Sequence, residues 1–279
     1  MIVHEQFPMR EKSNMRIGGI ADRYIEIEAR EELPAVYEKY DRIFLLGNGT
    51  NTLFYDGPLR YTFVSVKKTG GIVDLGKGLV RVGAGADFKD VIRFMREKDY
   101  SGLENLAGIP GSVGGLTWMN GGAYGSWIFD CVDEVEIFDE NHAFRKLKGH
   151  EIKSSYRHTE IQEKNWVILS VTFRFRRGFD LARVREIQAT REEKQPLNYP
   201  SLGSTFKNPE NDFAARLVAE AGLKGTVRGG AQISEKHPNF IINLGNATFS
   251  DVTGLMALMR DGVREKFGIT LKEEIIVLT

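Results

Sequence analysis

The segment Gly102–Gly125 (GLENLAGIPGSVGGLTWMNGGAYG) carries residues suited to binding a phosphorylated ligand, with eight glycines in twenty-four positions. Glycine lacks a Cβ and permits positive φ, so such a backbone approaches a ligand closely and its amides form an anion-binding concavity. Apolar side chains between the glycines, such as Leu106, Val113 and Trp118, favour an ordered loop–helix–loop over a linker. We therefore expect this segment to contact a bulky, partly anionic molecule such as a dinucleotide.

A second glycine cluster, Gly47–Asn51 (GNGTN), directly follows the short apolar run Ile43–Leu46. A strand followed by a glycine turn is the context expected of a phosphate-binding loop. Neither the GxGxxG pattern of Rossmann dinucleotide sites nor the GxxxxGK[ST] pattern of P-loops is present. The predicted nucleotide site therefore belongs to neither of these classes.

The elements that position these loops are predicted from hydrophobic periodicity. Asp87 is the expected N-cap of a helix, and Gly222 and Gly268 are expected to end two others. The mixture of antiparallel-looking sheet and helices predicts the α+β class. The expected strands are Ala21–Ala29, Ile43–Leu46, Tyr61–Val66, Ile72–Leu75, Leu79–Val82, Val132–Phe138, Trp166–Phe175 and Glu273–Leu278, and the expected helices are Glu31–Tyr40, Phe88–Lys98, Leu181–Glu193, Phe213–Ala221 and Asp251–Phe267.

Composition excludes several classes of function. The 279 residues contain 38 basic and 38 acidic side chains, so no basic excess favours nucleic acid or a membrane surface. Cys131 is the one cysteine, and with five histidines in no ligand-like cluster we expect neither disulfides nor a metal site. The polar N-terminal segment and the absence of a bilayer-length apolar run predict a cytoplasmic protein.

Several motifs occur together along the whole chain, in one order. They are RIGG (Arg16–Gly19), LGNGTN (Leu46–Asn51), VGAGA (Val82–Ala86), GLENLAGIPGSVGG (Gly102–Gly115), NGGAYG (Asn120–Gly125), SYR (Ser155–Arg157), GSTFKNP (Gly203–Pro209), GGAQIS followed by HPNFIIN, and LKEEI (Leu271–Ile275). Through them the chain resembles the UDP-N-acetylenolpyruvoylglucosamine reductase family, whose members complete UDP-N-acetylmuramate for the bacterial cell wall.

The resemblance implies a two-subdomain FAD-binding domain of the vanillyl-alcohol-oxidase type followed by an α+β substrate-binding domain. We assign residues 1–60 and 61–178 to the two FAD-binding subdomains and residues 179–279 to the substrate-binding domain, whose closing strand 273–278 carries a catalytic glutamate. The polar segment Arg176–Asp180 marks the main boundary. Only a few residues separate Phe175 from Arg183, which resembles the shorter family form without a tyrosine-bearing insertion.

The activity implied is reduction of UDP-N-acetylglucosamine enolpyruvate by NADPH through non-covalent FAD, in peptidoglycan synthesis. Hydride reaches the terminal enolpyruvyl carbon, charge develops on the carboxylate as an enolate, and a proton reaches the adjacent carbon. Such a reaction needs a cation at the carboxylate and a positioned acid at the carbon. The resemblance assigns the cation to Arg157, the proton donor to Ser204, and stabilisation of the enol to Arg157 and Glu274.

Each catalytic assignment has a structural alternative. Arg157 is by default a surface arginine, and Ser204 a turn residue beside a glycine. Glu274 competes with Glu273, which a strand would place on the opposite face. We choose Glu274 because it directly precedes the apolar run, as the resemblance to the family implies, and we expect it either to be protonated or to share a proton with the intermediate.

The remaining site predictions concern the ligands. The predicted cofactor-binding residues are Gly47, Asn48, Gly49, Thr50, Asn51, Ile109, Pro110, Gly111, Ser112, Gly115, Gly122, Ala123 and Gly125, and the predicted substrate-binding residues are Tyr156, Lys207 and Asn208. A solvated charge is an equally good interpretation of Lys207, and His237 is interpreted as structural. We expect a monomer that acts on a nucleotide sugar.

Two other functions remain open from sequence. One is an FAD-dependent sugar or alcohol oxidase of the same fold, although GNGTN lacks the histidine or cysteine needed for covalent flavin attachment there. The other is a nucleotide-sugar binder that has lost its flavin. Both glycine clusters and all three catalytic positions argue against it.

Overall fold

The computed structural model describes residues 1–279, which form two compact units, each with its own hydrophobic core. Unit 1 contains Met1–Glu5, Arg23–Asn48 and Tyr61–Ala189. Unit 2 contains Gln6–Asp22, Gly49–Arg60 and Thr190–Thr279. Each unit is therefore assembled from segments that are far apart in the sequence.

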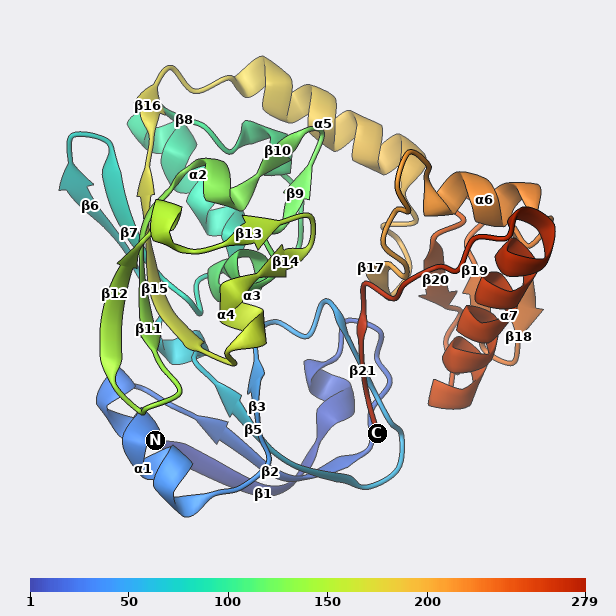
Figure 1. Ribbon diagram of the computed structural model, residues 1–279, viewed down its shortest axis with the longest axis horizontal. Coiled ribbons are helices and arrows are strands. Elements are labelled where there is room, and N and C mark those ends of the chain that lie inside the picture. The colour runs from blue at the N-terminus through green and yellow to red at the C-terminus, as the bar shows by residue number, and fades with distance from the viewer. The chain divides into compact units, whose positions relative to one another are not determined.

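A five-stranded antiparallel sheet of order β12-β11-β15-β7-β6 is the main sheet of unit 1 (Figure 1). Its central strand β15 is buried along most of its length, with Val171 and Phe173 fully inaccessible. Helix α3 packs on β15 and β7, and α2 buries Phe88, Val91, Ile92 and Met95 at helical spacing. The bounds are β6 (Ile72–Gly76), β7 (Leu79–Gly83), β11 (Val132–Phe138), β12 (Phe144–Lys148), β15 (Val167–Arg174), α2 (Phe88–Lys98) and α3 (Val113–Trp118).

The first glycine cluster directly follows strand β3 of a four-stranded sheet of order β1-β2-β5-β3. Strands β3 and β5 are parallel, with Leu46 opposite Ser65 at the point where Gly47 begins the loop. The bounds are β1 (Ile2–Pro8), β2 (Ile20–Glu26), β3 (Ile43–Leu46), β5 (Leu59–Ser65) and α1 (Leu33–Lys39).

Unit 2 contains a sheet of order β17-β20-β19-β18, against which helix α7 packs. A capping box between Thr248 and Asp251 starts α7, and Gly268 ends it at φ +70°. Strand β21 pairs in parallel with β4. The bounds are β4 (Thr52–Phe54), β17 (Ser201–Ser204), β18 (Val227–Arg228), β19 (Ala231–Ile233), β20 (Phe240–Asn243), β21 (Ile276–Leu278), α6 (Ala214–Glu220) and α7 (Phe249–Phe267).

Short elements complete the chain. The helix α5 (Leu181–Lys194) carries the chain from unit 1 into unit 2. The others are β8 (Tyr100–Ser101), β9 (Gly122–Ala123), β10 (Ser126–Trp127), β13 (Ser154–Ser155), β14 (His158–Thr159), β16 (Arg176–Arg177), α4 (Glu160–Glu163) and the 3-10 helices η1 (Met9–Lys12), η2 (Arg30–Glu32), η3 (Lys67–Thr69), η4 (Glu104–Leu106), η5 (Ile128–Asp130) and η6 (Gly149–Glu151).

Most predicted elements are confirmed, and the main correction concerns the closing strand. We predicted a strand over Glu273–Leu278, but β21 begins at Ile276. The amides of Glu274 and Ile275 both donate to the carbonyl of Thr205, at 2.9 and 3.5 Å, which breaks the regular ladder there. Glu273 and Glu274 therefore do not alternate as neighbours in a strand.

The predicted caps of two helices are partly right. Asp87 is the N-cap of α2, but its carboxylate accepts no hydrogen bond from the helix and instead accepts the side-chain amide of Asn48. Gly222 follows the C-cap Ala221 with φ +76°. Among all the helices, none is both long and apolar enough to traverse a membrane.

Candidate active site

Two of the predicted pyrophosphate loops meet in unit 1, at Gly47 and Ser112. A Cβ on Gly47 would stand 2.6 Å from Ser112 Oγ, so a larger residue fits only if the serine moves. Ser112 is buried and is the N-cap of α3, where its hydroxyl accepts the amide of Gly115 at 3.2 Å. The hydrogen bond of 2.6 Å from Asn48 Nδ2 to Asp87 Oδ1 holds the first loop against the start of α2.

The main-chain amides at this junction divide into two groups. Those of Val113 and Gly114 donate to the carbonyls of Ala86 and Ala84, at 2.9 and 2.8 Å, so the start of α3 is satisfied within the protein. The amides of Asn48, Gly111 and Ser112 donate to no protein acceptor. Bare amides beside a glycine whose Cβ would displace the Ser112 hydroxyl form a cradle whose donors fit phosphate oxygens. This part of the chain therefore fits the pyrophosphate of a dinucleotide.

The rest of the first loop, Gly49–Asn51, belongs to unit 2. Gly49 has φ +62°, and a Cβ there would lie 1.8 Å from the carbonyl oxygen of Lys12. Asn51 faces the C-terminal segment: its Nδ2 donates to the carbonyl of Glu274 at 3.2 Å, and its own carbonyl accepts the amide of Ile276 at 2.9 Å. The loop that we predicted to bind flavin thus also fixes the segment that carries the predicted catalytic glutamate.

The segment Gly122–Gly125 forms a tight hairpin in unit 1. Gly122 pairs with Trp127 and Ala123 with Ser126, so two residues make the turn. These are Tyr124 at φ +51° and Gly125 at φ +77°, as a type I′ turn requires. A Cβ on Gly122 would lie 2.4 Å from the Trp127 ring, which explains the glycine at that position.

Arg157 occupies the turn of a second hairpin, β13–β14, with φ +53°. Its Nη2 donates to the carbonyl of Gly122 at 3.0 Å, so the structure joins the predicted catalytic arginine to the predicted flavin segment. The guanidinium lies 5.8 Å from the Trp127 ring and 5.2 Å from the Tyr156 ring. These two rings meet edge to face at 5.7 Å, and together they limit where the guanidinium points.

Ser204 ends strand β17 in unit 2, and it is half-buried. It lies opposite Phe240 in the ladder, and the register shifts between Ser201 and Ser204. Gly203, at φ +78°, accommodates this irregularity. The bulge turns the serine out of regular sheet register.

Asn239, which is buried, fixes the residues that follow Ser204. Its carbonyl accepts the amide of Thr205 at 2.7 Å, its Oδ1 accepts the amide of Phe206 at 3.0 Å, and its Nδ2 donates to the carbonyl of Phe206 at 2.8 Å. The Thr205 carbonyl in turn accepts the amide of Glu274. The main chains that carry Ser204 and Glu274 are therefore joined through one residue.

The two neighbouring glutamates have different surroundings. Glu273 is exposed and pairs with Arg260 at 3.0 Å, whereas Glu274 is half-buried. An exposed carboxylate already paired with arginine is a poor candidate for enol chemistry. Glu273 is therefore the poorer candidate of the two, and the role of Glu274 stays a prediction.

Lys207 and Asn208 lie just beyond the Ser204 turn. The amide of Lys207 donates to the carbonyl of Lys272 at 2.8 Å, and Asn208 Oδ1 accepts the amide of Ala214 at 3.1 Å, at the start of α6. His237, on the nearby turn, packs on Phe240 with ring centroids 4.6 Å apart, and its Nδ1 has no hydrogen-bond partner. Burial lowers the pKa of His237.

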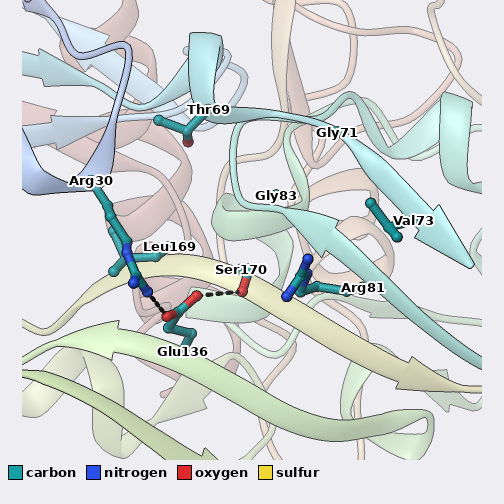
Figure 2. A pocket seen from close by; sticks show the side chains of 9 residues that line it. All are labelled: Arg30, Thr69, Gly71, Val73, Arg81, Gly83, Glu136, Leu169 and Ser170. Atoms are coloured by element: carbon teal, nitrogen blue, oxygen red, sulfur yellow. Dashed lines mark hydrogen bonds and ion pairs between the residues drawn. The ribbon is translucent and has the colours of Figure 1, made fainter. Parts of the chain in front are cut away.

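A cavity of about 240 Å³ lies on the polar face of the five-stranded sheet (Figure 2). Glu136, at its floor, pairs with Arg30 and accepts the hydroxyl of Ser170 at 2.9 Å. No predicted site residue is among those that line it. Because the carboxylate already neutralises Arg30, we assign no ligand to this cavity.

Comparison with known proteins finds two domain families along the chain. A model of the FAD binding domain family matches residues 23–147, and one of the UDP-N-acetylenolpyruvoylglucosamine reductase C-terminal domain matches residues 195–278. A UDP-N-acetylenolpyruvoylglucosamine reductase of Fusobacterium nucleatum is 57% identical over 97% of this chain and 97% of its own length. The chain belongs to the UDP-N-acetylenolpyruvoylglucosamine reductase family.

Other members of the family are similar over the whole chain. The reductase of Caldanaerobacter subterraneus is 40% identical over 97% of this chain and 92% of its own. The crystal structure of the reductase from Thermus caldophilus superposes with a TM-score of 0.87 at 30% identity and covers all of both chains. Only residues 175–180 lie between β15 and α5, which is consistent with the shorter family form.

Sequence reasoning missed several residues that support the predicted site. Trp127, Asn120 and Asn239 were assigned no role, yet Trp127 borders Arg157 and Asn120 Nδ2 donates to the carbonyl of Ser155 at 3.0 Å. NGGAYG contains Asn120 and HPNFIIN contains Asn239, whereas Trp127 lies outside both motifs. Membership in a motif was the available signal for the two asparagines, but their partners are distant in sequence.

Proposed function

We propose that this chain reduces UDP-N-acetylglucosamine enolpyruvate to UDP-N-acetylmuramate, with NADPH as the hydride donor and FAD as the cofactor. The observation that carries the proposal is the 57% identity to a reductase of this name over 97% of both chains. The FAD binding domain match supports the cofactor. The chain is accordingly an FAD-dependent oxidoreductase of peptidoglycan precursor synthesis.

The cradle at Gly47 and Ser112 supports binding of the FAD pyrophosphate by the amides of Asn48, Gly111 and Ser112. Bound FAD supplies the two-electron chemistry, taking hydride from the nicotinamide and passing it to the substrate. The hairpin that contains Gly122, Ala123 and Gly125 is proposed to border the flavin. The remaining cofactor residues are kept as proposed from sequence: Gly49, Thr50, Asn51, Ile109, Pro110 and Gly115.

Arg157 is proposed to hold the substrate carboxylate. A guanidinium presents its donors in a planar fork and stays charged while negative charge develops on the carboxylate. Its hydrogen bond to the Gly122 carbonyl and the rings of Trp127 and Tyr156 support a fixed orientation. Such preorganisation lowers the cost of binding the developing enolate.

Ser204 is proposed to give its hydroxyl proton to the carbon next to the carboxylate, and Glu274 to stabilise the enol. A serine hydroxyl is a weak acid, so its position relative to that carbon must be held closely. The hydrogen bond from the Glu274 amide to the Thr205 carbonyl supports such positioning, because it links the main chains that carry both residues. Lys207, Asn208 and Tyr156 are proposed to contact the substrate.

The ligands suggest where the chain acts. We propose a monomer in the cytoplasm, where nucleotide sugars and NADPH are available, with a role in cell-wall biogenesis and through it in cell shape and division. We also keep residues 1–60 and 61–178 as the proposed FAD-binding subdomains and 179–279 as the proposed substrate-binding domain. Analytical centrifugation of the purified protein tests the monomer.

An anaerobic absorbance experiment in the flavin band tests the proposed function. Addition of NADPH should bleach the yellow protein, and addition of UDP-N-acetylglucosamine enolpyruvate should recolour it rapidly. Recolouring only on admission of air would indicate an oxidase, and a colourless protein would indicate a binding protein. Ser204→Ala should leave bleaching intact and slow recolouring, whereas equal damage to both steps would remove Ser204 from the proton-donor role.

A further inference from the structure

We infer that Asn239 is a positioning residue, which sets the proton donor Ser204 relative to Glu274. The inference rests on the proposed function and extends it to a residue that makes no contact with the reacting atoms. Its basis is the pattern of hydrogen bonds that the buried Asn239 side chain makes.

The side-chain amide of Asn239 makes two hydrogen bonds to the main chain of one residue, as a neighbouring strand would. Its Oδ1 accepts from the amide of Phe206 at 3.0 Å and its Nδ2 donates to the carbonyl of the same residue at 2.8 Å. Only 2% of Asn239 is exposed, so water does not replace these partners when they are lost. The carboxamide therefore pins the main chain two residues after Ser204.

The same main chain is held from its other side by the segment of Glu274. The Thr205 carbonyl accepts the amide of Glu274 at 2.9 Å, and Phe206 forms an isolated bridge with Glu273. The turn Thr205–Phe206 thus lies between Asn239 and the predicted acid. Loss of the Asn239 side chain releases the main chain of Phe206, while the Thr205 amide keeps its bond to the Asn239 carbonyl and the Thr205 carbonyl keeps its bond to Glu274. The turn that carries Ser204 is then held less closely relative to Glu274.

The chain offers a matched control at the other end of strand β20. Asn243 is 3% exposed, and its side chain makes three hydrogen bonds: to the carbonyl of Met15 at 2.9 Å, and from the amides of Gly245 and Ala247 at 2.7 and 3.1 Å. None of these partners belongs to the Ser204 turn. Asn243→Ala therefore removes three side-chain hydrogen bonds, against two for Asn239→Ala, without acting on Ser204.

The test compares Asn239→Ala and Asn243→Ala in the two half-reactions of the FAD-loaded protein. Asn239→Ala should recolour with the enolpyruvyl sugar roughly 10- to 100-fold more slowly, while bleaching by NADPH changes by less than about 2-fold. Asn243→Ala should keep the recolouring rate even where its melting temperature falls. Asn239→Asp keeps the acceptor for the Phe206 amide and loses the donor to the Phe206 carbonyl. Its recolouring rate should lie between those of the natural protein and Asn239→Ala.

A double-mutant cycle with Ser204→Ala separates positioning from general destabilisation. If Asn239 acts through Ser204, the double variant recolours no more slowly than Ser204→Ala alone. The inference would be overturned if the double variant slowed recolouring by the product of the two single effects. It would also be overturned if Asn239→Ala and Asn243→Ala slowed recolouring equally. Should Asn239→Ala fail to fold, the same cycle with Asn239→Asp decides. Failure of the natural protein to recolour would refute the proposed function, and the inference with it.

Discussion

The side-chain amide of Asn51 donates a hydrogen bond of 3.2 Å to the main-chain carbonyl of Glu274, across 223 residues of sequence. Asn51 also accepts the amide of Ile276 through its own carbonyl at 2.9 Å. The glycine loop predicted to bind pyrophosphate is thereby joined, within unit 2, to the segment of the predicted acid. A change in this loop should therefore affect the reduction of substrate as well as the retention of flavin.

Asn51→Asp tests this relationship, because aspartate keeps the size of the side chain and removes the donor. A carboxylate facing the Glu274 carbonyl repels it, so we expect recolouring by substrate to slow by about 10-fold. Stopped-flow absorbance of both half-reactions measures the effect. Asn48→Ala is the matched control, since Asn48 bonds to Asp87 in unit 1, and it should weaken FAD retention without slowing recolouring selectively. Selective slowing of recolouring in Asn48→Ala but not in Asn51→Asp would show that the Asn51–Glu274 hydrogen bond does not affect substrate reduction.

Arg157→Lys tests the proposed binding of the substrate carboxylate by the guanidinium. Lysine keeps the charge, but one ammonium group does not both bond the Gly122 carbonyl and present a planar fork. We expect recolouring to slow roughly 100-fold, with bleaching by NADPH little changed. Arg174→Lys, an exposed arginine paired with Asp133, serves as the control. Unchanged recolouring in Arg157→Lys would exclude the bidentate role.

Cys131 should be chemically inert in the folded protein. Burial raises the pKa of its thiol to about 11, with the nearby Asp130 and Glu104 carboxylates adding to the shift. At pH 8 the thiolate fraction is then roughly a hundredfold below that of an ordinary cysteine. Labelling with a disulfide reagent should be slow in buffer and fast in urea. Rapid labelling of the native protein would show that the thiol is accessible and ionised.

His237 should make stability depend on pH. Burial lowers its pKa in the folded protein below the ordinary 6.5, so the unfolded chain binds the proton more readily. The neutral, buried His237 therefore contributes to the free energy of unfolding in full above about pH 6.5. This contribution falls as the pH drops toward the folded-state pKa, by at most about 1.4 kcal/mol per pH unit. The free energy of unfolding of His237→Gln, measured in urea from pH 5 to 7, should vary less steeply. His150→Gln, at an exposed histidine, should follow the natural profile.

The fold was largely predictable because its signals are local. The apolar spacing of Phe88–Lys98 predicted α2 with its exact bounds, and the alternation in Val132–Phe138 did the same for β11. The start of β21 was not predictable. It depends on two amides meeting the Thr205 carbonyl, which is about 70 residues earlier in the chain.

The reacting groups of the candidate site were proposed from motifs, whereas the residues that support them could not be predicted from the sequence. Arg157 was found through its motif, but its positive φ and its bond to Gly122 depend on two hairpins meeting in space. Asn239 looks like any asparagine beside a proline and a phenylalanine. The role that we propose for it depends on a non-local strand pairing between Ser204 and Phe240, which no periodicity in the sequence indicates.

The parallel pairing of β4 with β21 has a consequence for how the protein is made. Thr52–Phe54 is synthesised roughly 220 residues before its partner Ile276–Leu278. At translation rates of about 5–20 residues per second, β4 waits for about 10 to 45 seconds. Throughout that time a fully apolar pair, Leu53 and Phe54, is exposed without its partner strand. The nascent chain should therefore engage a chaperone at β4, and the binding should end once β21 emerges.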